Sequence, residues 1–227
     1  MPVSDHDVTE LLADVRRGRL RVGRRARAVV LLLHGGRAED RQPSRWKDVS
    51  YLRMLPFAWD ITWRSRGRVA PLLVHNTHGG WVAPSGSGVV QARELIRGLV
   101  EEHSLPVVVL GHSSGGWAAL RVAADPGVVG AVALAPWVAQ DEPTAHLVGS
   151  GARVRVVHGE ADEVCDPWRA RDYVAALAAK GVDATFDLVP GGNHALLDKP
   201  WRWHARATRA VLDLTLARPS TSTTSTA

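Results

Sequence analysis

The sequence predicts an α/β fold: a doubly wound, mostly parallel sheet with helices on both faces. Three observations support this prediction. Continuous apolar runs of strand length, such as Ala28–Leu33 and Val128–Ala135, are typical of strands buried on both faces of a parallel sheet. Segments with apolar residues at helical spacing separate these runs. The connections are short throughout, as strand–helix alternation requires.

Length and composition favour one intracellular domain. At 227 residues the chain can bury a full core, and we expect a single domain over residues 28–217. The only cysteine, Cys165, excludes an internal disulfide and fits a reducing compartment. The first ten residues are polar, and the longest apolar run is too short to cross a bilayer. We therefore expect a cytoplasmic protein without membrane insertion; nothing in the sequence indicates an oligomeric state.

The two ends differ from the central domain. Residues 1–27 form a basic segment, with seven arginines in 16–27. A solvated pair of edge strands, with Leu20 and Val22 facing inward, is favoured there over a nucleic-acid or membrane patch, because no aromatic residue interleaves to stack on bases. No nucleic-acid partner is therefore expected. Residues 218–227 have almost nothing apolar to bury and are predicted to be a disordered tail.

The remaining elements follow in chain order. Strands are expected at 28–33, 69–74, 107–110, 128–135, 154–157 and 184–189. Trp46–Trp59 carries Val49, Leu52, Leu55 and Trp59 at helical spacing, interrupted by Pro56. Further helices are expected at Val89–His103, directly after Gly116, from Pro167 to a stop at Gly181, and from Pro200.

Polar side chains gather where these strands end. His34-Gly35-Gly36, His75, Ser113, Trp137, Asp162 and His194 each follow a strand. In open α/β sheets, ligands bind beyond the carboxyl ends of the strands. Residues far apart in the sequence are therefore expected to meet at one edge of the sheet.

The stretch Val107–Gly116, VVVLGHSSGG, is the most informative part of that edge. An apolar strand runs directly into Gly-x-Ser-x-Gly, and a small apolar helix follows. Strand, sharp turn and helix are the context in which this motif presents an exposed serine hydroxyl. The glycines are needed because a Cβ in so tight a turn would collide with neighbouring backbone. Ser113 is therefore a candidate nucleophile.

A serine hydroxyl needs a base, and the base needs an acid that fixes its tautomer. His194, in a glycine-rich loop after the last strand, and Asp162, after the preceding strand, are the candidates. Asp141 could also reach a histidine, whereas Asp166 precedes Pro167 and is predicted to cap a helix. His112 adjoins the nucleophile, but neighbouring side chains on a sharp turn point apart.

A tetrahedral oxyanion needs hydrogen-bond donors. The N–H of Ser114, at the start of a helix, and the N–H of Gly36, or of Arg37, are expected to supply them. Trp81 and Trp137 are candidate walls of a small substrate pocket, with core packing as the alternative. No metal site is predicted, because the histidines lack ligand spacing such as H-x-x-x-H. Cys165 is predicted to be a buried apolar residue and not a nucleophile.

These motifs together resemble the α/β-hydrolase family over residues 28–216: HGG, GHSSGG, HGEADEVCDP and GGNH occur in the family's order of nucleophile, acid and histidine. More narrowly, the chain is similar to small bacterial hydrolases near the dienelactone hydrolases. The latter use cysteine at the turn where this chain has serine, so their substrate is not carried over. Many members of the larger family insert a helical cap after the strand that ends near Trp137. The connection here is short, which predicts a minimal cap and an open site.

The resemblance implies Ser113, Asp162 and His194 as catalytic residues, with Gly36 and Ser114 as oxyanion donors. It favours a cofactor-free serine hydrolase that cleaves small carboxylic esters through an acyl-enzyme. The same residues could serve a thioesterase, peptidase or acyltransferase. A hydrolase-like binding module without turnover is the alternative from another class.

Overall fold

The structure is a computed structural model that describes residues 22–36, 48–76, 81 and 87–216. Within these residues, six strands form one parallel sheet in the order β2-β1-β3-β4-β5-β6. The strands are β1 (Ala28–Leu33), β2 (Val69–Val74), β3 (Val107–His112), β4 (Val128–Leu134), β5 (Arg153–Gly159) and β6 (Asp183–Val189). The predicted fold class is confirmed, with every pairing parallel.

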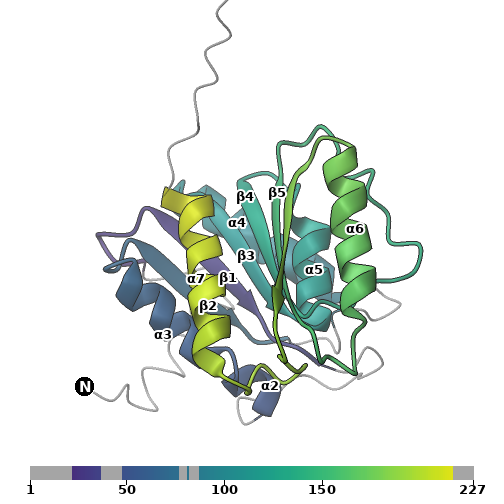
Figure 1. Ribbon diagram of the computed structural model, residues 1–227. Helices are drawn as coiled ribbons and strands as arrows, with labels where there is room; N and C mark the ends of the chain where they lie inside the picture. Colours follow the sequence, from purple (N-terminus) through teal and green to yellow (C-terminus); the bar gives the residue numbers. More distant parts are fainter. Residues whose placement is uncertain (1–21, 37–47, 77–80, 82–86, 217–227) are drawn as a thin grey trace, which may run out of the picture.

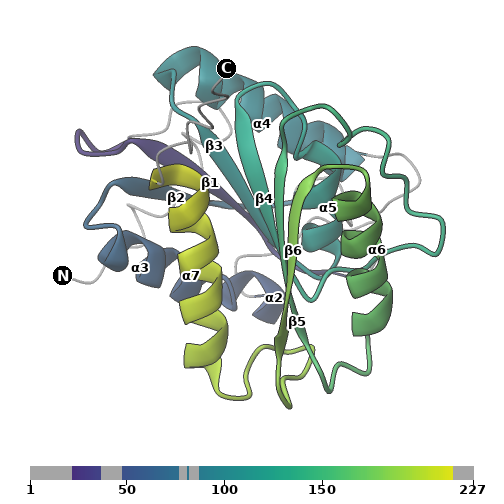
Figure 2. The ribbon, with the colours of Figure 1, turned by 45° about the horizontal axis from the view of Figure 1, so that its top comes forward.

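Helices cover both faces of the sheet (Figure 1). They are α2 (Val49–Leu52), α3 (Leu55–Arg64), α4 (Ser87–His103), α5 (Ser114–Val122), α6 (Pro167–Ala179) and α7 (Pro200–Leu216). Helices α3 and α7 lie on one face, and α4, α5 and α6 lie on the other, as Figure 2 shows from a second direction. The result is the three-layer arrangement that alternating strands and helices produce.

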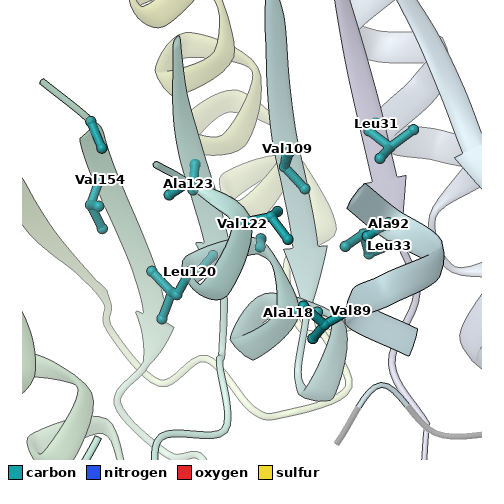
Figure 3. Packing of buried hydrophobic residues seen from close by; sticks show 14 of the residues in the cluster. Leu31, Leu33, Val89, Ala92, Val109, Ala118, Leu120, Val122, Ala123 and Val154 are labelled. Carbon is teal, nitrogen blue, oxygen red and sulfur yellow. The ribbon is translucent and has the colours of Figure 1, made fainter. Parts of the chain in front are cut away.

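Two apolar clusters, one on each face, hold the layers together. The larger cluster joins Leu31, Val109 and Val154 of the sheet to Ala92 of α4 and Leu120 of α5 (Figure 3). The other cluster lies beneath α3 and α7. Strands β1 and β3 are buried at all six positions, because each has helices on both faces. Their unbroken apolar sequences follow directly from this burial.

The strand order places a switch point between β1 and β3. From β1 the chain turns outward to β2 and then returns to pair β3 on the other side of β1. Connections therefore leave β1 and β3 in opposite directions, which opens a crevice at their carboxyl ends. His34-Gly35-Gly36 and Ser113 directly follow these two strands.

The helical spacing predicted over 46–59, interrupted by Pro56, belongs to two short helices. Its described part forms α2 and α3 with a break at Arg53–Met54, and Pro56 lies in the first turn of α3, where a missing N–H costs nothing. The four apolar residues that gave the helical spacing are exposed: Val49, Leu52, Leu55 and Trp59. The buried residues are Tyr51, Met54, Phe57 and Ile61. The last three belong to the cluster beneath α3 and α7, whereas the Tyr51 ring contacts the rings of His34 and His75.

Several predictions concern residues outside the described part. Of the basic segment 1–27, only residues 22–27 are described, and they form a turn before β1. The edge strands predicted there and the tail at 218–227 therefore remain predictions. No helix within the described residues is long and apolar enough to cross a membrane.

Candidate active site

The turn between β3 and α5 holds Ser113 in a strained backbone conformation, with φ 55° and ψ −119°. This conformation depends on two close backbone approaches. A Cβ on Gly111 would lie 2.0 Å from the carbonyl oxygen of Gly115, and a Cβ on Gly115 would lie 2.4 Å from that of Leu33. Only glycine fits at either position, so the two glycines of the motif allow the sharp turn that presents Ser113.

Three residues from distant segments meet in one hydrogen-bonded line. Ser113 Oγ lies 3.0 Å from His194 Nε2, and His194 Nδ1 lies 2.8 Å from Asp162 Oδ2. Ser113 follows β3, Asp162 lies in the loop after β5, and His194 lies in the loop after β6. The two loops are joined directly, because Ala161 N–H donates to the carbonyl of Gly192 at 2.9 Å. The structure thus brings together all three residues predicted to be catalytic.

Both carboxylate oxygens of Asp162 are fully engaged. Oδ1 accepts the backbone N–H groups of Val164 and Cys165, each at 2.9 Å. Oδ2 accepts from His194 and, at 3.1 Å, from His158 Nε2. Burial alone would raise the pKa of Asp162, but the hydrogen bonds from His158, His194 and Cys165 outweigh it and hold that pKa well below its usual range. Asp162 is therefore a carboxylate at neutral pH.

The competing acids are placed elsewhere. Asp166 accepts the N–H groups of Trp168 and Arg169 and caps α6, as predicted. Asp141 is exposed in the connection between β4 and β5. Asp162 is the acid that contacts His194.

His112 supports the loop that carries His194. Its Nε2 lies 2.9 Å from the carbonyl oxygen of His194, so this nitrogen carries the hydrogen and donates. Burial, followed by repulsion from His194 and Arg53, lowers the pKa of His112 to about 3. The ring is therefore neutral at physiological pH. Its N–H is committed to the backbone of the loop that carries His194.

The two predicted oxyanion donors lie on the same cleft. Ser114 is the first residue of α5, where a backbone N–H has no partner within the helix. Its side-chain hydroxyl donates to the carbonyl of Gly36 at 3.1 Å, which ties the segment after β1 to the nucleophile turn. Both residues line the cleft beside Ser113. Arg37, the alternative donor, lies outside the described residues.

The cleft has a volume of about 400 Å³ and mixed walls. Trp137, Val164, Cys165 and Arg53 line it together with the three segments named above. Burial raises the pKa of the Cys165 thiol to about 12, with the charge of Asp162 adding to the effect, so the thiol stays protonated. Burial lowers the pKa of the Arg53 guanidinium, and its Nε has no hydrogen-bond partner among the described residues.

The prediction that Trp81 walls the pocket is wrong. Its side chain is completely buried in the large cluster beneath β1 and α4. Its Nε1 donates to the carbonyl of His34 at 2.7 Å, so the indole holds the backbone directly after β1 in place. A Cβ on Gly88 would also clash with the backbone of Trp81, which shows how closely α4 packs on it.

A model of the dienelactone hydrolase family matches residues 88–216, more than half of the chain. The chain belongs to the dienelactone hydrolase family. It is therefore an α/β-hydrolase enzyme, and membership in this family indicates a small-molecule substrate. No curated protein sequence matches it at a significant level.

Solved structures show the same fold at low sequence identity. A thermophilic esterase from Thermogutta terrifontis superposes with a TM-score of 0.65 and 14% identity, covering 86% of this chain and 85% of the esterase. A protein of unknown function from Agrobacterium tumefaciens superposes with a TM-score of 0.63 and 16% identity, covering 84% of this chain and 86% of that protein. An α/β serine hydrolase homologue from Coxiella burnetii superposes with a TM-score of 0.61 and 14% identity, covering 81% of this chain and 85% of the homologue.

In this dienelactone hydrolase family member, the connection after β4 adds no helical cap. The connection at 135–152, between β4 and β5, consists of turns and irregular backbone and contains no helix. This agrees with the minimal cap expected from its length. Among the residues described, no group of three or more His, Cys, Asp or Glu side chains could hold a metal ion.

Two residues at the site were not singled out by the sequence motifs. His158 belongs to the strand end HGEAD, but only the folded loop shows that its ring reaches Asp162. Arg53 reaches the cleft because the chain breaks between α2 and α3. Pro56 was the one sign in the sequence that the helical pattern breaks near Arg53.

Proposed function

We propose that this protein is a serine hydrolase that cleaves small carboxylic esters through an acyl-enzyme intermediate. The observation that carries the proposal is the continuous hydrogen-bonded line from Ser113 through His194 to Asp162. Such a line is what converts a weakly nucleophilic hydroxyl into an attacking group.

The geometry sets the direction of proton transfer. Nδ1 of His194 faces a carboxylate oxygen that can only accept, so Nδ1 carries the hydrogen and Nε2 presents its lone pair to Ser113. As Oγ of Ser113 bonds to the ester carbonyl carbon, its proton passes to Nε2. The imidazolium formed in this step is stabilised by the charge of Asp162.

The electrons of the ester carbonyl move onto its oxygen. The N–H groups of Ser114 and Gly36 are proposed to donate to this oxyanion, with the N-terminus of α5 adding positive potential. Each such donor is typically worth about 3 kcal/mol of barrier. Collapse of the tetrahedral species breaks the bond to the alcohol, which leaves with the proton from Nε2. A water molecule then repeats the sequence on the acyl-enzyme and frees Ser113.

Two features of the cleft support a small, weakly selected substrate. Its volume of about 400 Å³ suits a short acyl group, and the connection at 135–152 adds no helix over it. The indole of Trp137 is 37% exposed and offers an apolar wall beside the nucleophile. The protein from Thermogutta terrifontis that shares the fold is an esterase, which supports ester cleavage as the reaction.

Pre-steady-state hydrolysis of p-nitrophenyl acetate tests the proposal. An acyl-enzyme predicts a burst of p-nitrophenol that approaches one equivalent per protein and is followed by slower turnover. In a series of p-nitrophenyl esters, kcat/KM is expected to fall as the acyl chain lengthens beyond the size of the cleft. Steady turnover that persists in Ser113→Ala at the wild-type rate would refute the proposal.

A further inference from the structure

His158 is a buried histidine whose ring contacts the same carboxylate oxygen of Asp162 as His194 does. It is the penultimate residue of β5 and is completely buried. Its Nε2 lies 3.1 Å from Asp162 Oδ2 and 3.1 Å from the carbonyl oxygen of Cys165. Both of these atoms are acceptors when Asp162 is ionised, so Nε2 must carry a hydrogen that it shares between them.

The other ring nitrogen agrees with this tautomer. His158 Nδ1 is buried and has no hydrogen-bond partner among the described residues. A hydrogen on Nδ1 would be a buried donor without an acceptor, which costs about 1–3 kcal/mol, whereas an unused lone pair is tolerated more easily. The ring therefore acts as a single donor directed at the acid loop.

We propose that His158 is a positioning residue, whose Nε2–H anchors Oδ2 of Asp162 so that the carboxylate stays aimed at His194 and divides its charge between two imidazoles. This inference rests on the proposed function of the site. His158 does not line the cleft, so it acts on the reaction only through Asp162.

The contact does two things at once. By bonding Cys165 as well as Asp162, His158 closes the loop 158–165 on itself and fixes its two cleft residues, Val164 and Cys165. By donating to Oδ2, it also competes with His194 for the negative charge. Removing that donor leaves the full charge of Asp162 to His194, which stabilises the imidazolium and raises the pH at which Ser113 becomes reactive.

The other charged and titratable groups around the pair do not titrate in the same range. His112 faces His194 from β3 with ring centroids 5.0 Å apart, and its pKa is lowered to about 3, chiefly by burial. The Cys165 thiol has its pKa raised to about 12, also by burial. Arg53, on the α2 side of the cleft, keeps a constant positive charge. The carboxylate of Glu160 accepts from Gly191 N–H at 3.1 Å, at the base of the two loops.

Three substitutions separate positioning from packing. His158→Gln keeps an N–H at nearly the place of Nε2, because the two side chains reach equally far from Cβ. His158→Leu fills similar space without a donor. His158→Asn keeps an amide that is too short to reach Oδ2, and it replaces His158→Leu in the comparison if the leucine variant does not fold. Near-ultraviolet circular dichroism and thermal unfolding establish that each variant is folded.

Hydrolysis of phenyl acetate is followed by pH-stat titration from pH 5 to 9. In the donor-less variant, kcat is expected to fall about 10- to 100-fold through misplacement of the acid. The acid limb of kcat/KM is expected to move upward by about 0.5–1 pH unit. His158→Gln is expected to restore both quantities to near the wild-type values. A purely structural role of His158 would lower the melting temperature without moving the acid limb.

The inference is overturned if a folded donor-less variant keeps the wild-type acid limb, or if His158→Gln behaves like His158→Leu. Ser113→Ala is measured in parallel. If it is inactive while the His158 variants behave as wild type, only the role of His158 is refuted. If it retains full activity, the proposed function fails and the role of His158 fails with it.

Discussion

Asp162→Asn replaces one side-chain oxygen by an NH₂ group, so one acceptor of the site becomes a donor. Oδ1 of Asp162 accepts two backbone N–H groups, those of Val164 and Cys165. These donors are fixed by the chain and require an acceptor, so the carbonyl oxygen of the asparagine must face them. Its NH₂ group then occupies the place of Oδ2 and points at the ring N–H groups of His158 and His194.

The magnitude follows from this conflict. His194 can avoid a donor–donor contact only by moving its hydrogen from Nδ1 to Nε2, which removes the lone pair that takes the proton of Ser113. A wrong tautomer of this kind lowers kcat by about 10⁴-fold in serine proteases, equivalent to about 5.5 kcal/mol of barrier. We expect a loss of the same order here, with the substrate's KM little changed because Asp162 does not touch substrate.

Steady-state hydrolysis of phenyl acetate measures the effect, with Asp166→Asn as the matched control. Asp166 caps α6 four residues away, and asparagine caps a helix equally well, so this control is expected to keep wild-type activity. An Asp162→Asn enzyme within tenfold of the wild-type kcat would refute the reasoning, because Asp162 would then not set the tautomer of His194.

Three further predictions concern stability. Gly115→Ala is expected to destabilise the fold by about 3 kcal/mol in urea unfolding, since its Cβ would meet backbone at 2.4 Å. Gly98→Ala, in open space on α4, is expected to stabilise the fold by about 0.5–1 kcal/mol. A change of the same sign in both variants would contradict this explanation. Ser113→Gly is expected to be about 1 kcal/mol more stable than Ser113→Ala in thermal unfolding, because glycine relieves the strain at φ 55°; equal stability would argue against strain. The pKa of His112 is about 3 in the folded protein and about 6.5 in the unfolded chain, so the unfolded chain binds the extra proton and the free energy of unfolding should fall as pH drops from about 6.5 towards 3. His112→Gln should flatten that dependence, and an unchanged slope would contradict the assignment.

Much of the architecture follows from local patterns. Strands β1, β3 and β4 have helices on both faces, and their apolar sequences therefore identify them without any tertiary information. Helices α6 and α7 begin at Pro167 and Pro200, and the glycine that closes α6, Gly181, adopts φ +81°. Proline and glycine act through the backbone alone, so these boundaries are predictable from sequence.

The errors arise where tertiary packing decides. The apolar residues at helical spacing in 49–59 belong to two helices, and the break between them shifts which face is buried. Trp81 was predicted to wall the pocket, with core packing as the alternative; the carbonyl of His34 after β1 accepts from its indole and holds it in the core. Neither outcome is encoded in the spacing of residues along the chain.

The site was predictable in part for a topological reason. Parallel strands end at one edge, so Ser113, Asp162 and His194 could be expected to converge from their positions after β3, β5 and β6. The direction of an individual ring was not predictable. His158 reaches Asp162 because the loop between them folds back on itself through Cys165, and this closure depends on the whole loop.

Covalent labelling of Ser113 is the decisive measurement of whether the hydrogen-bonded line to Asp162 activates this hydroxyl. A fluorophosphonate probe, followed by intact-mass measurement and peptide mapping, reports whether this hydroxyl is an activated nucleophile. We expect one label per protein on Ser113, no label in Ser113→Ala, and wild-type labelling in Ser150→Ala, whose hydroxyl donates to the carbonyl of Leu147 and does not line the cleft. Absence of labelling in the wild-type protein, or equal labelling of Ser113→Ala, would contradict this expectation.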